Sequence, residues 1–197
     1  MNTNQFNKER YNRKKQKYRF ILGIQQLLNH YYLNLLWIPF VIVVVFMAMM
    51  VRKFVTSVKV HPIFENIFPV SMALIVILIS IIVVVGIIQF IGYCFAIKDE
   101  ADIEFVFDER DIKNQPPVLI YKKKDRRSGV VKREFYSAIS MERWQEKKES
   151  ICDRMNIHLV GDITYGGKKK NRGDHIYFES AKGRSPLERG VLYDDIL

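Results

Sequence analysis

Residues 67–97 read IFPVSMALIVILISIIVVVGIIQFIGYCFAI and contain no Asp, Glu, Lys or Arg. As an α-helix this run would be about 46 Å long, which exceeds the roughly 30 Å hydrocarbon core of a bilayer. We therefore expect a membrane-spanning helix that either tilts or projects a turn or two beyond the membrane. Pro69 suits its first turn, and Gly92 with Ala96 forms a small-xxx-small pair that favours close helix packing.

An earlier uncharged run occupies residues 33–51. It would span about 28 Å as a helix, which matches the bilayer core. Its β-branched residues would favour a strand in water, but a lone strand in lipid leaves its backbone polar groups unpaired. Trp37 lies near one end, where amphipathic rings favour the interface, and Arg52 and Lys53 close the other end. The two runs together predict an α-helical transmembrane hairpin of two spans.

The distribution of charge predicts the orientation of this hairpin. The chain has 197 residues and a net charge of +10. Residues 1–32 hold seven Lys and Arg against a single Glu, whereas residues 98–197 hold 21 basic and 19 acidic side chains. By the positive-inside rule we expect a multi-pass protein of the bacterial cell membrane. Its basic N-terminal segment and residues 98–197 would both be cytoplasmic, and residues 52–66 would form a short external loop.

The basic stretch at residues 8–19 has two interpretations. Lys and Arg side chains close to a membrane attract anionic lipid headgroups. The aromatic residues Tyr11, Tyr18 and Phe20 could instead stack on the bases of a nucleic acid. The sequence alone leaves both interpretations open.

The remaining residues predict a small cytoplasmic α+β domain. Residues 98–117 have the composition of a polar connector, and the proline pair at its end disfavours a helix immediately before it. The domain itself would then comprise residues 118–197. Strand-like runs at 118–121 and 130–136, separated by a glycine-containing turn, predict a hairpin.

Ser140 is expected to begin an amphipathic helix of about four turns, in which apolar residues recur at helical spacing around Trp144. Two more strand-like runs follow it, at residues 157–165 and 175–178. The order β-β-α-β-β predicts a sheet with one face covered by the helix. Five apolar residues are the expected core anchors: Val118, Ile120, Phe135, Trp144 and Ile151.

The residues supply no catalytic constellation. Two glycines in residues 161–167 have P-loop spacing, but Gly167 stands where the phosphate-binding lysine should be. No zinc-ligand spacing, nucleophile elbow or paired-carboxylate pattern is present in the sequence. We therefore expect that this chain is not an enzyme and that it takes no cofactor and no metal.

Two predicted turns are strongly basic. Cationic side chains on such turns can contact the phosphate groups of a nucleic acid. Hairpin tips are also often charged simply because they are solvated, so a structural explanation competes with this one. The candidate nucleic-acid or phosphate contacts are Lys122, Lys123, Lys124, Arg126, Arg127, Lys168, Lys169, Lys170 and Arg172.

Several short stretches follow one another in an order typical of a known family. They are residues 116–123 (PPVLIYKK), 134–135, 141–148 (MERWQEKK), 155–158 and 192–194. Placed after two N-terminal spans, this order resembles the region between the membrane hairpin and the motor of FtsK/SpoIIIE-type DNA translocases and conjugative coupling proteins of Gram-positive mobile elements. The resemblance covers most of residues 33–197.

Members of that family pump DNA through hexameric ATPase rings. The resemblance implies that the nucleotide-binding residues lie in a motor domain after position 197, so no P-loop residue is carried over to this chain. The chain then looks like the membrane anchor and assembly region of a conjugative-transfer or segregation machine. It would be either a piece of a longer translocase or a separate protein.

The resemblance also implies partners. They are the lipid bilayer and either further copies of the chain or a DNA-translocase motor or secretion partner, with DNA contacted indirectly. The alternative is a membrane-tethered nucleic-acid-binding or adaptor module that has no motor partner.

Overall fold

The computed structural model describes four stretches of the chain: residues 3–58, 61–112, 115–167 and 169–183. The chain divides into two compact units. The helical unit comprises residues 12–96, and the sheet unit comprises residues 1–11 together with 97–197. Helices α1 (Thr3–Asn29) and α3 (Ile67–Val106) each contribute residues to both units.

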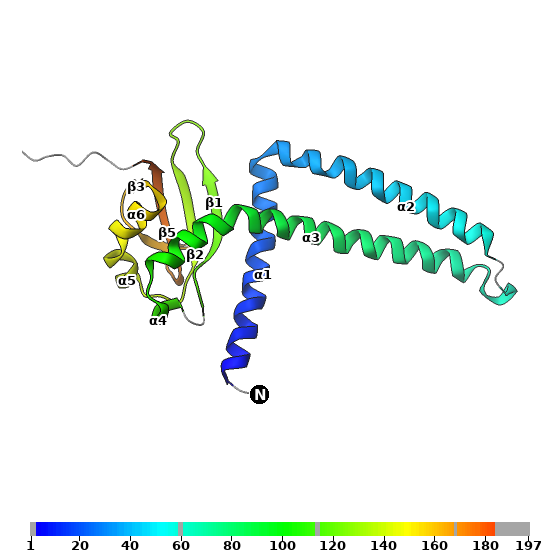
Figure 1. The fold of residues 1–197 in the computed structure, drawn as a ribbon, viewed down its shortest axis with the longest axis horizontal. Coiled ribbons are helices and arrows are strands. Elements are labelled where there is room, and N and C mark those ends of the chain that lie inside the picture. Colours follow the sequence, from blue (N-terminus) through cyan, green and yellow to red (C-terminus); the bar gives the residue numbers. More distant parts are fainter. Residues whose placement is uncertain (1–2, 59–60, 113–114, 168, 184–197) are drawn as a thin grey trace, which may run out of the picture. The chain divides into compact units, whose positions relative to one another are not determined.

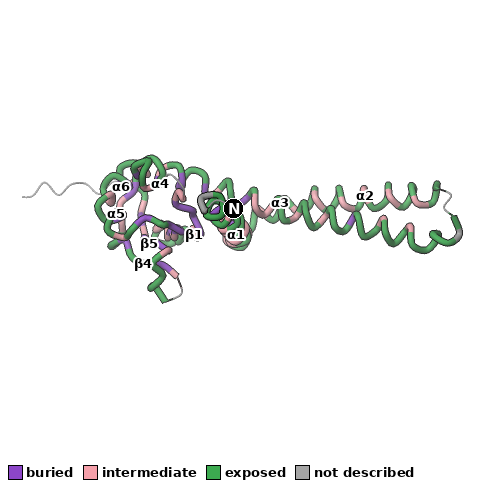
Figure 2. Tube along the Cα trace, turned by 90° about the horizontal axis from the view of Figure 1, so that it is seen from below, coloured by how far each residue is buried: buried purple, intermediate pink, exposed green. Residues whose placement is uncertain are grey.

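Two long apolar helices run antiparallel in the helical unit (Figure 1). After the 3₁₀ helix η1 (Tyr31–Leu36), α2 (Trp37–Ser57) leads through the short η2 (Pro62–Phe64) into α3. The rings of Phe54 and Phe68 lie 6.4 Å apart, which brings the end of α2 beside the start of α3. Both helices are long and apolar enough to cross a membrane. No residue of α2 is buried, and Figure 2 shows this helix pair exposed along most of its length.

Both helices extend beyond the uncharged runs. α2 continues past Lys53 to Ser57, so the first residues of the expected external loop are helical. α3 continues nine residues past Ile97 to Val106, and the short helix α4 (Glu109–Ile112) follows. The expected connector is therefore largely helical. Its sequence contains no Gly or Pro before Pro116, so nothing local ends the helix where charged residues begin.

α1 crosses α3 at two glycines within the helical unit. A Cβ added to Gly23 would strike the backbone of Ile88, and a Cβ added to Gly92 would strike the backbone of Arg19. The two helices can approach this closely because neither glycine carries a side chain. Ala96, one turn after Gly92, is fully buried. The small-residue pair in the sequence thus lies in a close helix contact.

The sheet unit is built on an antiparallel sheet. β5 pairs with β2 along one side and with β3 and then β4 along the other. β1 pairs with β2 and forms an edge of the sheet as described. The strands are β1 (Val118–Lys124), β2 (Val131–Tyr136), β3 (Ile157–Leu159), β4 (Thr164–Gly166) and β5 (Arg172–Lys182).

The structure subdivides two of the predicted elements. One long helix was predicted after Ser140, and the structure has α5 (Met141–Glu146) and α6 (Lys148–Met155). The break lies at Lys147. The next residue, Lys148, is the charged residue that interrupts the apolar stripe of the predicted helix. The strand predicted at 157–165 is likewise divided into β3 and β4, because the chain leaves the regular ladder near Gly161, where φ is +106°. From β1 onward, the described residues of the sheet unit therefore follow the order β-β-α-α-β-β-β.

Aromatic rings form the core of the sheet unit. Trp144 packs against Phe135 of β2, Phe178 of β5 and Phe107, with ring centroids 5.7, 6.5 and 5.0 Å apart. Ile103 of α3 is also fully buried. The end of α3 and helix α5 thus lie against the same face of the sheet. All five expected core anchors are buried: Val118, Ile120, Phe135, Trp144 and Ile151.

Replacing Gly92 with Ala should separate α1 from α3, because the added methyl group overlaps the Arg19 backbone. Overpacking costs about 1–3 kcal/mol, against the roughly 1 kcal/mol that Ala gains over Gly in helix propensity. Trypsin should therefore cut the basic α1 segment faster in Gly92→Ala than in the unaltered chain, both in detergent. Gly86→Ala is the matched control, since no atom lies within 4 Å of its added Cβ. Equal cleavage rates in the two variants would contradict the crossing.

Candidate functional site

Asp125 shapes the tip of the β1–β2 hairpin. Its carboxylate accepts hydrogen bonds from the Ser128 hydroxyl at 2.7 Å and from the Arg127 backbone N–H at 3.0 Å. Its backbone N–H donates to the Val130 carbonyl, and its own carbonyl accepts the N–H of Gly129, whose φ is +71°. The hydrogen bonds from Ser128 and Arg127 favour the ionised form and hold the pKa of Asp125 below its usual value. Local hydrogen bonds therefore fix the shape of this turn.

The basic residues of the hairpin divide into an exposed set and an inward-facing one. Lys122 faces inward and forms an ion pair of 2.8 Å with Asp99 of α3. Exposed cations on a rigid turn can bind phosphate groups through charge. Four exposed side chains form what we call the hairpin patch: Lys123, Lys124, Arg126 and Arg127.

The second basic turn connects β4 to β5. Lys169 and Lys170 are exposed there. Arg172 forms an ion pair of 3.1 Å with Asp174, so its charge is partly offset. Lys168, which was also a candidate, lies outside the described residues.

The register of β5 places the two basic turns at opposite ends of the sheet. Arg172 pairs with Gly166 at the β4–β5 turn, whereas Ser180 pairs with Val131 beside the hairpin patch. The eight positions from Arg172 to Ser180 correspond to about 26 Å of extended strand. The structure therefore does not bring the two turns together into one phosphate-binding surface.

A buried ionic network centred on Asp99 lies next to the hairpin. Asp99 Oδ2 accepts a hydrogen bond from Arg133 Nε at 2.9 Å and lies 2.8 Å from Lys122 Nζ. Arg133 also donates to Ser180 Oγ at 2.5 Å. Asp99 and Arg133 are both buried, so each charge depends on the other for compensation. The network fixes the end of α3 against β1, β2 and β5.

Two neighbouring carboxylates extend this contact. Glu100 accepts the backbone N–H of Leu119 at 2.7 Å, which satisfies a polar group of the edge strand β1. Asp102 pairs with Arg154 of α6 at 3.2 Å, and that guanidinium carbon lies 4.1 Å from the centre of the Phe105 ring. Sequence reasoning treated these carboxylates as part of a polar connector. The signal for them is a cluster of acidic residues that directly follows an uncharged helical run.

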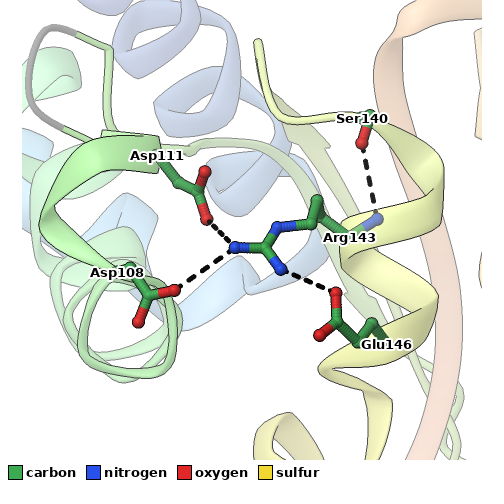
Figure 3. Close-up of polar contacts among 5 residues, drawn as sticks. All are labelled: Asp108, Asp111, Ser140, Arg143 and Glu146. Carbon is green, nitrogen blue, oxygen red and sulfur yellow. Dashed lines mark hydrogen bonds and ion pairs between the residues drawn. The ribbon is translucent and has the colours of Figure 1, made fainter.

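Arg143 joins α5 to the segment that follows α3 (Figure 3). One guanidinium nitrogen lies 3.3 Å from carboxylate oxygens of both Asp108 and Asp111, and another lies 2.7 Å from Glu146. The backbone N–H of Arg143 donates to the Ser140 hydroxyl that caps α5. The hydrogen bond and charge of Glu146, followed by the charge of Asp111, raise the pKa of Arg143 above its usual value.

Glu134 of β2 holds the β4–β5 turn in place. Its Oε1 accepts the Gly167 N–H at 2.9 Å and lies 2.5 Å from Nδ1 of His175. A Cβ at Gly166 would lie 2.6 Å from Glu134 Oε1, so the absence of a side chain there leaves room for this carboxylate. Burial by itself would raise the pKa of Glu134, but the hydrogen bonds from His175 and Gly167 hold that pKa below its usual value.

Tyr11 is not available to stack on a nucleic-acid base. It is buried in the sheet unit, and its hydroxyl donates to the Pro116 carbonyl at 2.8 Å. The nucleic-acid interpretation of the basic N-terminal stretch therefore loses one of its three aromatic residues. Tyr18 and Phe20 belong to the helical unit and are partly exposed.

The residues that the structure describes offer a cluster of exposed positive charge in the hairpin patch. Within them, no group of three or more His, Cys, Asp or Glu side chains could hold a metal ion. The carboxylates of Asp99, Glu100, Asp102 and Glu134 are engaged in contacts that hold the fold. The hairpin patch is the better candidate for a phosphate contact because its four cations face solvent.

Comparisons with known proteins give a partial structural likeness. No protein-family model matches the chain, and no curated protein matches it. Among solved structures, the chain is similar to the pCW3 conjugation coupling protein TcpA in its monomer form with ATPγS, with a TM-score of 0.37 and 19% sequence identity. The likeness covers 45% of this chain and 25% of that chain, so it spans a quarter of the length of that protein. At this level of likeness, function is not carried over from that protein.

Replacing Asp99 with Asn should destabilise the sheet unit by about 3–5 kcal/mol, because it leaves the buried Arg133 without its carboxylate partner. Asp162→Asn is the matched control. It breaks the exposed ion pair with Lys148 and should cost less than about 1 kcal/mol. Urea unfolding of the full chain in detergent, followed by Trp144 fluorescence in a Trp37→Phe background, measures both free energies of unfolding. Equal losses would show that the Asp99 network does not hold the unit together.

Proposed function

We propose that this chain is the membrane anchor and assembly region of a DNA-translocating machine in the bacterial cell membrane. Both termini would lie in the cytoplasm. The observation that carries the proposal is that α3 is one unbroken helix of 40 residues. Its first 31 residues carry no charge, and its last nine include the carboxylates that fix the sheet. One helix thus supplies both a membrane-compatible segment and a structural part of the sheet unit.

Exposed apolar surface supports the anchoring role. Soluble monomers rarely expose contiguous apolar patches beyond a few hundred Å², yet large hydrophobic side chains are exposed along both α2 and the first part of α3. The segment Tyr31–Ser57, which comprises η1 and α2, is long and apolar enough to cross a bilayer. The excess of basic residues before the first span supports a cytoplasmic N-terminus.

The sequence resemblance to the region between the hairpin and the motor of FtsK/SpoIIIE-type proteins supports the assembly role. The sheet unit offers an exposed basic turn, the hairpin patch, on a fold held by buried ion pairs. The energy for DNA movement would come from a motor partner, or from a motor segment of the same protein. The unit would position that motor at the membrane or assemble with further copies of this chain.

The full chain should require detergent for extraction and should then form oligomers or bind an FtsK/SpoIIIE-type motor subunit. Size-exclusion chromatography with light scattering measures both behaviours. Asp99→Asn is a useful comparison, because association through the folded sheet unit should weaken in that variant, whereas association through the apolar hairpin should persist. A chain recovered without detergent, or a detergent-bound monomer that binds no motor subunit, would contradict the proposal.

The hairpin patch favours a second candidate function, a membrane-tethered module that binds nucleic acid. Each phosphate contact contributes about 0.9 to the slope of log affinity against log salt concentration for duplex DNA. Lys123→Gln with Lys124→Gln should therefore lower that slope by about two in fluorescence-anisotropy titrations of the full chain with a labelled duplex. Lys169→Gln with Lys170→Gln, which changes the charge equally at the other end of the sheet, should have less effect. Equal effects, or no binding at low salt, would remove this candidate.

A further inference from the structure

A groove lies beside the glycine crossing of α1 and α3, within the helical unit. Its volume is about 340 Å³, and it is open to the surface. We infer that this groove binds the headgroup of an anionic phospholipid, an inference that rests on the membrane anchoring proposed above. The residues that line it are Arg13, Gln16, Lys17, Phe20, Val85 and Gln89.

The groove combines the groups that a phospholipid headgroup requires. Arg13 and Lys17 are exposed and stand four residues apart on α1, so their side chains emerge from the same face of the helix. A guanidinium and an ammonium together bind a phosphate through charge-assisted hydrogen bonds. The amides of Gln16 and Gln89 can hydrogen-bond the ester and glycerol oxygens.

The apolar part of the groove fits the start of an acyl chain. Phe20 and Val85 line the same groove as the cations and amides. A ligand that is anionic at one end and apolar at the other matches this combination better than a free phosphate, which would leave Phe20 and Val85 without a role. A nucleic-acid strand could stack a base on Phe20, but it would leave the aliphatic Val85 without a role.

The level of the groove along α3 agrees with a headgroup. Phe68 contacts Phe54 near the end of the hairpin that connects α2 to α3. α2 is 21 residues long, and the same number of residues counted from Phe68 leads to Ile88, the neighbour of Gln89. A span that begins near Phe68 and covers a hydrocarbon core of about 30 Å therefore ends close to Gln89. The groove lies where the hydrocarbon gives way to headgroups.

Arg19 of α1 does not line the groove. This residue is buried, and its guanidinium carbon lies 5.8 Å from the centre of the Tyr93 ring of α3. Arg19 therefore faces the crossing, while Arg13 and Lys17 are exposed. α1 thus places one cation in the crossing and presents two others at the surface beside the groove.

Native mass spectrometry of the full chain in mild detergent tests the site. Phosphatidylglycerol should be retained in preference to phosphatidylcholine. Arg13→Gln with Lys17→Gln should reduce that retention about tenfold or more, as expected for the loss of two charge-assisted contacts. Lys8→Gln with Arg10→Gln is the control, since it changes the charge of the same helix equally at exposed positions that do not line the groove. Arg13→Lys with Lys17→Arg keeps both charges and should restore retention.

Each possible result either supports or overturns the proposed phospholipid site. Loss of phosphatidylglycerol in the groove variant but not in the control supports the site. Equal losses in the two variants would mean diffuse attraction to basic residues, and equal retention of the two lipids would mean no headgroup preference. Displacement of phosphatidylglycerol by a short single-stranded oligonucleotide would assign the groove to nucleic acid. Each of these last three results overturns the inference while leaving the anchor intact, whereas a chain that needs no detergent overturns the proposed function itself.

Discussion

The carboxylate of Asp99, shared between Arg133 and Lys122, is the interaction on which the sheet unit depends. A buried carboxylate is costly unless it is paired, and here it is paired twice, in a helix whose first 31 residues carry no charge. The end of α3 brings Ile103 into the core, and Phe107, directly after the helix, meets Trp144 there. The folded unit therefore includes the end of α3, although the sequence places its boundary at the proline pair. Residues 97–106 belong to the sheet unit and contribute the buried side chains of Asp99, Glu100 and Ile103.

The helical unit is organised by a different constraint, the absence of side chains at Gly23 and Gly92. Glycine at both positions lets the two backbones approach more closely than any side chain would permit. α1 uses this contact to lie against α3 while it keeps exposed cations on another face. The basic helix α1 thus packs directly against the apolar helix α3.

Local patterns in the sequence were enough to predict the helical hairpin, the β1–β2 hairpin, the α+β composition and Trp144 as a core residue. Each depends on periodicity or turn chemistry within a short window. The sequence did not predict the Asp99–Arg133 pair, because the two residues are 34 positions apart and nothing local connects them. It also did not predict that Lys122 turns inward while Lys123 and Lys124 remain exposed.

The sequence also did not predict that the two basic turns are separated, because their separation depends on contacts between distant parts of the chain. Their positions depend on the register of β5 against its neighbours, and a register becomes fixed only when the whole sheet is assembled. The division of the predicted helix at Lys147 and of the predicted strand near Gly161 likewise reflects tertiary packing. Sequence reasoning therefore identified the residue types of a candidate phosphate contact, but not which of them share a surface.

The hydrogen bond from the Leu119 backbone N–H to the Glu100 carboxylate affects whether a further strand can pair with the β1 edge of the sheet. A peptide that extends a sheet must pair with unoccupied backbone groups at an edge, and on β1 one such group is already engaged by α3. Pairing through the Leu119 N–H would first require Glu100 to release it. Strand addition at β1 would therefore compete with the contact that holds the end of α3 on the sheet.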